Sequence, residues 1–169
     1  MKTRDFIFIS LWFYIGWFGC VLLASTAYGA MSFIFPAILF SFLFFKKQVS
    51  FQFINIFVGI SLVGIFFDSL VIHFEWMTIS GPSDYLIPIW LVSIWFLFAL
   101  SIPKLGFLIK APLWVMALLG CIMGPLSYKS GELFEVLTLT SPWTIFIYAL
   151  FWTIFFPMVI FTTRRFHEY

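Results

Sequence analysis

The chain has 169 residues, of which 63% are hydrophobic, 24% are aromatic and only 9% are charged. Soluble domains carry roughly 25% charged residues, and a soluble core of this size could not enclose so many aromatic rings, so a soluble globular protein is excluded. The net charge is only +2 and the basic residues are scattered, which also argues against a nucleic-acid-binding surface. We therefore expect an all-α membrane protein with the lipid bilayer as its main partner.

The first apolar segment is expected to cross the membrane over residues 6–24. Lys2 and Arg4 precede it, a layout that also resembles a signal peptide. The apolar run is long for a cleaved signal and is rich in aromatic residues, so we expect a retained helix. At about 20 residues per crossing, the chain then forms a single membrane domain over residues 1–169.

Five further spans are expected along the chain. They cover residues 30–45, 53–73, 85–101, 111–128 and 142–162. Pro36 inside the second span predicts a kink or a local break, and Ser141 followed by Pro142 gives the sixth span a favourable start. The fold predicted from these segments is a compact bundle of six transmembrane helices.

The orientation follows from the lysines and arginines that flank the spans. Six crossings place eight of them on one side: Lys2, Arg4, Lys46, Lys47, Lys104, Lys110, Arg164 and Arg165. Only Lys129 falls on the other side. Because basic residues next to short loops stay in the cytoplasm, both termini are expected to be cytoplasmic.

A polar stripe on the third span contains the acidic residue deepest in any predicted helix. At helical spacing the stripe comprises Ser61, Gly64, Asp68 and Glu75, whereas Asn55, Gly59 and His73 fall on another side. His73 is therefore not expected to bond directly to Asp68. Burying a carboxylate in a span costs roughly 2.5 to 3.5 kcal/mol, so other groups must offset that cost.

Two roles remain open for Asp68. It could form a proton or cation site, or line a polar substrate path together with Ser61, Gly64, Asn55, His73 or Tyr128. Alternatively, it is a structural carboxylate that accepts hydrogen bonds from hydroxyls, from tryptophan N–H groups or from backbone opened by a proline.

The fifth span carries a notch of small residues. Gly120 and Gly124 lie four residues apart, a spacing that lets another helix approach closely, so helix packing is the favoured role. Pro125 frees a backbone carbonyl, and near Tyr128 it could produce a polar, partly unwound end. Trp90 and Trp95 on the fourth span are expected to be interfacial anchors.

Motifs for common chemistry are absent from the sequence. It has no phosphate-binding glycine loop, no paired histidines for a metal and no nucleophile elbow. Cys20 and Cys121 lack metal spacing and read as small hydrophobic residues. We predict no catalytic residue, no metal and no cofactor, and expect that the protein is not an enzyme.

A set of short motifs resembles a known family. The residues that carry the resemblance are Gly64, Asp68, Ser69, Pro88, Trp90, Gly120, Gly124, Pro125, Leu126, Ser127, Tyr128 and Gly131. Over nearly its whole length the chain resembles an uncharacterised family of small bacterial inner-membrane proteins, described only as a domain of unknown function. It departs from the family pattern at residues 133–135. The resemblance implies an inner-membrane location and, through neighbouring genes similar to cyclopropane-fatty-acid synthases, a link to membrane-lipid modification.

A second, architectural resemblance is to the MreD-type rod-shape component and to substrate-binding subunits of vitamin transporters. Three functions follow as expectations. The first is a non-enzymatic accessory subunit that binds other inner-membrane proteins of lipid or envelope metabolism. The second is a small transporter or flippase subunit with a polar path lined by Asp68. The third is a membrane-embedded lipid-modifying enzyme that uses Asp68 or Tyr128 as acid or base.

Overall fold

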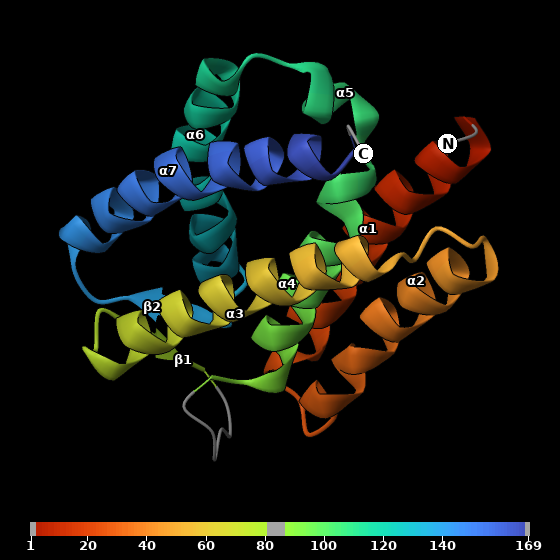
Figure 1. Ribbon diagram of the computed structural model, residues 1–169. Coiled ribbons are helices and arrows are strands. Elements are labelled where there is room, and N and C mark those ends of the chain that lie inside the picture. The colour runs from red at the N-terminus through yellow and green to blue at the C-terminus, as the bar shows by residue number, and fades with distance from the viewer. Residues whose placement is uncertain (1–2, 81–86, 168–169) are drawn as a thin grey trace.

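Helices make up nearly all of the structure, a computed structural model that describes residues 3–80 and 87–167 (Figure 1). In chain order the elements are α1 (Thr3–Ala24), the 3-10 helix η1 (Gly29–Phe33), α2 (Ile34–Phe45), α3 (Phe51–His73), β1 (Met77–Ile79), α4 (Ile89–Ser101), the 3-10 helix η2 (Ile102–Lys104), α5 (Gly106–Lys110), α6 (Leu113–Leu133), β2 (Leu137–Leu139) and α7 (Pro142–His167). The predicted all-α class is confirmed, apart from a two-stranded ribbon that the sequence did not predict.

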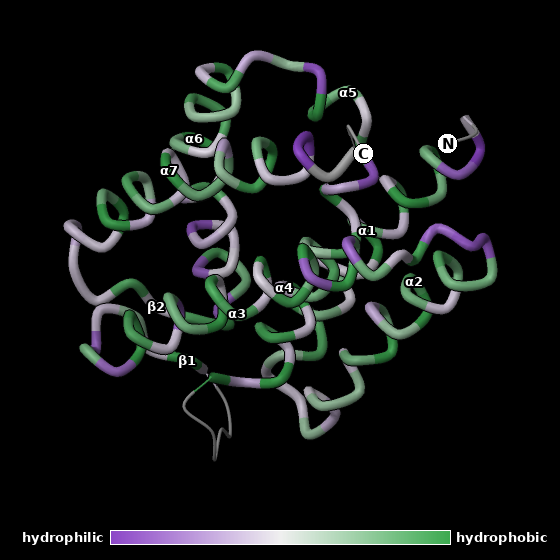
Figure 2. The backbone as a smooth tube through the Cα atoms, in the orientation of Figure 1, coloured by the Kyte–Doolittle hydropathy of each residue, from purple (hydrophilic) through white to green (hydrophobic). Residues whose placement is uncertain are grey.

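Four of the described helices, α1, α3, α6 and α7, are long and apolar enough to cross a membrane. Two shorter apolar segments, 29–45 and 89–104, each join an α-helix to a 3-10 helix. Hydrophobic residues run along the helices, whereas hydrophilic residues gather at the N-terminus and beyond the end of α2 (Figure 2). Such long apolar helices have the length and composition of membrane-spanning segments.

The predicted second span differs in detail from the structure. A 3-10 helix replaces its first turn, and α2 begins at Ile34, so that Pro36 is the third residue of the α-helix. A proline in the first turn removes no intrahelical hydrogen bond, because the N–H groups there have no partner within the helix. The break in the segment therefore precedes Pro36, and no kink follows from it.

The fourth and fifth spans also differ from expectation. Helix α4 begins at Ile89, with Pro88 as its extended N-cap, whereas Tyr85, the predicted start, lies outside the described residues, as does Lys2. Helix α6 continues through a buried Pro125 to Leu133, five residues beyond the predicted end. The unwound end expected near Pro125 is not found.

Helices α3 and α6 end in the same local structure. The sequence Phe-Glu-Trp-Met-Thr-Ile-Ser of residues 74–80 is matched sixty residues later by Phe-Glu-Val-Leu-Thr-Leu-Thr of residues 134–140. In both copies the glutamate has a left-handed backbone, with φ of 57° at Glu75 and 58° at Glu135. The residue after it donates its N–H five residues back, from Trp76 to Val71 and from Val136 to Gly131. Each helix is thus closed by the same C-terminal capping motif.

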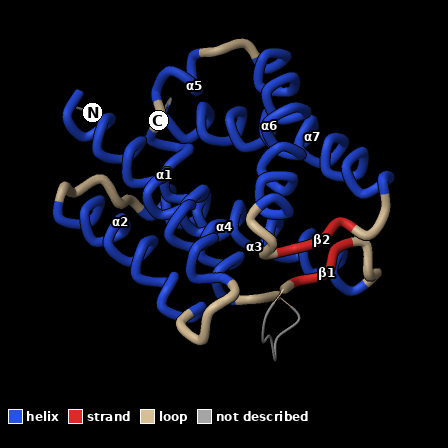
Figure 3. The backbone as a smooth tube through the Cα atoms, turned by 180° about the vertical axis from the view of Figure 1, so that it is seen from behind, coloured by secondary structure: helices blue, strands red, loops and turns tan. Residues whose placement is uncertain are grey.

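The two copies meet in the β ribbon. Strands β1 and β2 lie side by side (Figure 3) and are antiparallel. Thr78 lies opposite Thr138, its counterpart in the repeat. Beyond the strands, Ser80 donates to the carbonyl of Val136 and Thr140 donates to that of Trp76, at 3.0 and 3.1 Å. Each of these two bonds joins the same pair of repeat positions, with donor and acceptor in opposite copies. A local two-fold axis therefore relates α3 and β1 to α6 and β2.

A separate polar cluster joins the N-terminal end of α1 to the C-terminal end of α2 and to η2. Asp5 of α1, which is buried, lies 3.2 Å from the Lys46 ammonium and accepts a hydrogen bond from the Gln48 amide at 3.1 Å. Lys104 donates to the carbonyl of Gln48 at 2.6 Å. The cluster connects α1, the end of α2 and η2, and the buried carboxylate of Asp5 is paired with the Lys46 ammonium, as a buried ion requires.

Candidate functional site: a four-helix carboxylate cluster and a lateral groove

The carboxylate of Asp68 is fully buried and accepts three hydrogen bonds from side chains. Its Oδ1 accepts from the hydroxyl of Tyr128 at 2.8 Å and from that of Tyr148 at 3.1 Å. Its Oδ2 accepts from Nε1 of Trp95 at 2.7 Å. Both oxygens therefore have donors, which is what a carboxylate needs when it is removed from water.

Four helices contribute to this cluster. Asp68 comes from α3, Trp95 from α4, Tyr128 from α6 and Tyr148 from α7, so the carboxylate connects segments up to 80 residues apart. The rings of Tyr128 and Tyr148 stack with centroids 3.6 Å apart. This stacking places both hydroxyls at the same oxygen.

Two glycines allow the aromatic rings to reach these positions. A Cβ on Gly64 would collide with the ring of Trp95, and a Cβ on Gly124 would collide with the ring of Trp152. The two tryptophan rings are themselves stacked, with centroids 5.4 Å apart and planes 6° from parallel. Because Gly64 and Gly124 are also sixty residues apart, the repeat extends into the core.

The repeat relates the acceptor to one of its donors. Asp68 and Tyr128 lie sixty residues apart, the same interval as the two capping motifs, so they occupy equivalent positions in the two copies. The bond between them crosses from one copy to the other. Chemically, the arrangement links the two copies and gives each carboxylate oxygen at least one neutral donor.

The other predicted members of the polar set lie elsewhere. Ser61 is buried, but its hydroxyl has no hydrogen-bond partner among the described residues. Asn55, His73 and Glu75 are exposed and do not contact the carboxylate. The buried stripe therefore ends before Glu75, because α3 ends at His73.

Sequence reasoning missed Tyr148 and treated Trp95 only as an interfacial anchor. The signal that could have indicated Trp95 is the sixty-residue repeat, which aligns Gly64 with Gly124 and Asp68 with Tyr128. Once the copies are aligned, Trp95 of α4 and Trp152 of α7 become candidates for packing against the two aligned glycines. Gly120 of the predicted packing notch lies against the backbone of Trp152 on α7.

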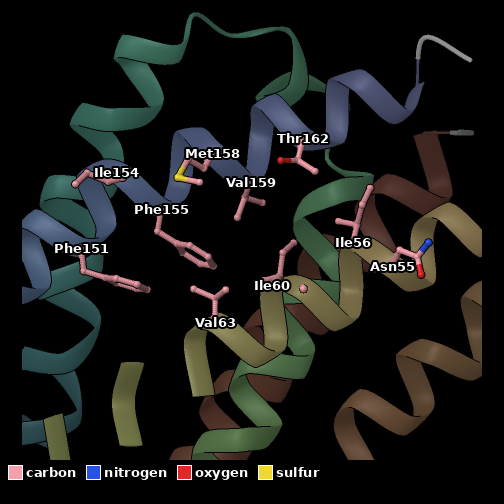
Figure 4. Close-up of a pocket in the computed structure, with 11 residues that line it drawn as sticks. Asn55, Ile56, Ile60, Val63, Phe151, Ile154, Phe155, Met158, Val159 and Thr162 are labelled. Carbon is pink, nitrogen blue, oxygen red and sulfur yellow. The ribbon is translucent and has the colours of Figure 1, made fainter. Parts of the chain in front are cut away.

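A groove with a volume of about 500 Å³ lies between α3 and α7. Its wall is mainly apolar, and Asp68 does not line it. Asn55 and Thr162 lie at one end of the groove, and Val63 and Phe151 lie toward the other (Figure 4). Within residues 3–80 and 87–167, no three histidine, cysteine or acidic side chains are grouped to hold a metal ion.

Comparison with known proteins gave one match. Searches against curated proteins and against solved structures found no significant similarity. The family model described as "Protein of unknown function (DUF2878)" matches residues 6–158. This match covers most of the chain, and it confirms the resemblance to an uncharacterised family. The chain belongs to the DUF2878 family of proteins of unknown function.

Proposed function

We propose that this protein is a non-enzymatic accessory subunit of bacterial inner-membrane machinery for lipid or envelope modification. In this proposal the chain crosses the membrane six times, with both termini in the cytoplasm, and binds other inner-membrane proteins. The observation that carries the proposal is that Trp95, Tyr128 and Tyr148 donate to both oxygens of the Asp68 carboxylate in a fully buried position. A carboxylate that works as acid, base or ion ligand needs an approach for its substrate.

The distribution of charge supports the six-span orientation. The polar cluster of Asp5, Lys46, Gln48 and Lys104 lies at helix ends that the orientation places on the cytoplasmic side. The β ribbon lies at the far ends of α3 and α6. The segments 29–45 and 89–104 are near the lower limit of roughly 17 residues for a crossing.

The exposed surface supports a role in interaction. Many large apolar side chains are exposed along the candidate spans, including Leu22, Phe66 and Leu150. Exposed apolar surface on this scale is compatible with lipid or with the helices of a partner protein. The function therefore depends on surfaces and not on a central cavity.

A deletion strain tests the proposal. Compared with its parent, the strain is expected to show an altered lipid profile, and affinity purification of the tagged protein in mild detergent is expected to recover membrane proteins of lipid or envelope metabolism. Asp68→Asn is expected to lower the abundance of the protein while the remaining molecules restore the lipid profile in proportion. An Asp68→Asn protein that is inserted at normal abundance but fails to restore the profile would contradict the non-enzymatic role.

A transporter or flippase subunit is the second candidate, favoured by the internal repeat. Several transporter folds are built from repeats, with the substrate site at the interface between them, and Asp68 and Tyr128 lie at such an interface here. The purified protein in vesicles would then move a labelled lipid or metabolite between compartments. Movement that Asp68→Asn abolishes, with insertion unchanged, would favour this candidate over the accessory role.

A further inference from the structure

We propose that the groove between α3 and α7 binds one acyl chain of an anionic phospholipid of the inner leaflet, with the phosphate held beside Asn55, Thr162 and Arg165. The leaflet assignment rests on the membrane orientation proposed above. The groove itself, its lining and its polar end are properties of the described structure.

The chemistry of the lining points to a hydrocarbon chain. Ile60, Val63, Phe155 and Met158 are among the residues that face the groove, and no charged side chain lines it. Such a surface gains free energy when it takes up apolar material from its surroundings by close packing. Gly59 contributes an open position, since a Cβ there would meet no atom within 4 Å.

The length of the groove matches one leaflet. The lining runs from Asn55 to Val63 on α3 and from Thr162 to Phe151 on α7. At about 1.5 Å per residue these stretches span roughly 12 and 16 Å, close to half of the roughly 30 Å hydrocarbon core. A membrane-spanning helix of a partner protein would need a groove about twice as long.

Charge complementarity indicates an anionic headgroup. Both polar lining residues, Asn55 and Thr162, lie at the same end of the groove (Figure 4). Arg165 follows Thr162 by three residues on α7, is exposed, and has its guanidinium 5.1 Å from the ring of Phe161. An amide and a hydroxyl at one end, followed by an exposed arginine three residues further along α7, suit a phosphate diester.

Photo-crosslinking can test the site directly. The full chain is placed in nanodiscs of phosphatidylethanolamine and phosphatidylglycerol with a trace of phosphatidylglycerol that carries a diazirine on one acyl chain. After illumination, mass spectrometry of peptides locates the adducts. We expect adducts concentrated on the groove-lining residues of α3 and α7, and competition by unlabelled phosphatidylglycerol at least threefold stronger than by phosphatidylethanolamine.

Matched variants separate the groove from the general lipid-facing surface. Gly59→Trp fills the open position and is expected to reduce the groove adducts at least threefold, whereas Val58→Trp, an exposed neighbour outside the lining, leaves them unchanged. Arg165→Gln is expected to remove the preference for phosphatidylglycerol, and Lys47→Gln is its control on the same side. Circular dichroism and gel filtration check that each variant is folded.

Two results would overturn the inference. Adducts spread evenly over the exposed helices, or unchanged in folded Gly59→Trp, would show that no acyl chain is held in the groove. Equal competition by the two phospholipids would remove the anionic specificity. These outcomes are independent of the deletion strain: a bound lipid with an unaltered lipid profile would refute the accessory function and leave the groove site standing.

Discussion

At the scale of single residues, the feature that organises the core is the carboxylate of Asp68 with its three donors. Because Oδ1 has two donors and Oδ2 has only Trp95 among the described residues, the three hydrogen bonds are not equivalent. Loss of the single donor leaves a buried oxygen unpaired, which costs the full desolvation penalty of the group. Loss of one of two donors costs less.

Replacement of Trp95 tests this difference. Trp95→Phe is expected to lower the free energy of unfolding by about 1 to 3 kcal/mol more than Trp90→Phe does. Trp90 is a suitable control because it is also buried on α4, yet its Nε1 has no hydrogen-bond partner among the described residues. Titration with sodium dodecyl sulfate in mixed micelles, followed by circular dichroism, measures both values. Equal losses for the two variants would show that ring volume alone matters.

Part of this cluster could be predicted from sequence, and part could not. The position of Asp68 in an apolar helix predicts that polar partners must exist, and tryptophan N–H groups and hydroxyls are among the donor types that this position requires. The identity of Tyr148 could not be predicted from local pattern, because it lies 80 residues away and a tyrosine in an apolar helix has no distinctive spacing. Only the fold brings the two together.

At the scale of helices, close packing depends on glycines whose surroundings differ. A Cβ on Gly120 would meet the carbonyl oxygen of Trp152, which is backbone and cannot move aside, whereas a Cβ on Gly59 would meet nothing within 4 Å. The sequence identified the spacing of Gly120 and Gly124 as a packing notch. It could not say which helix would lie against them, and the structure places α7 there.

Gly120 and Gly59 should respond in opposite ways to replacement by alanine. Gly120→Ala is expected to destabilise the protein by about 1 to 3 kcal/mol, because α6 and α7 must separate to admit the methyl group. Gly59→Ala is expected to stabilise it by about 0.5 to 1 kcal/mol, since alanine loses less backbone entropy in a helix. Unfolding in mixed micelles measures both. A similar change of the same sign at both sites would refute this assignment.

The helix ends offer a further test. Glu135 has a φ of 58°, a left-handed conformation that favours glycine at a helix C-terminus. Glu135→Gly is therefore expected to raise the free energy of unfolding by roughly 1 kcal/mol. Met123→Gly, an exposed position inside α6, should lower it by a similar amount. Thermal unfolding in detergent compares the variants, and a destabilised Glu135→Gly would contradict the capping motif.

At the scale of the whole molecule, composition predicted the helical class and helices apolar enough to cross a membrane, because apolar length and charge are properties of local sequence. The ends of the helices were less predictable. Pro125 and Lys129 suggested an early end for the fifth span, yet α6 continues to Leu133 because Gly131 and Val136 close it with the capping bond. The ribbon escaped prediction since each strand has only three residues.

The proposed orientation predicts which side of the membrane each exposed position reaches. In a background with Cys20→Ala and Cys121→Ala, Thr78→Cys and Thr138→Cys on the ribbon should react with a membrane-impermeant maleimide in intact spheroplasts. Lys47→Cys should react only after the membrane is permeabilised. Labelling of Lys47→Cys in intact spheroplasts would overturn the assignment of the basic helix ends to the cytoplasm.

The local two-fold axis limits which kind of polypeptide can form this core. If two identical polypeptides met across the axis, the residue at position 68 would face its own copy, acid against acid or phenol against phenol. Two buried carboxylates in contact repel each other, and neither could satisfy the other's oxygens. A single polypeptide that carries both halves escapes this constraint, since Asp68 can stand opposite Tyr128. Covalent fusion of the halves is what permits a complementary pair at their shared centre.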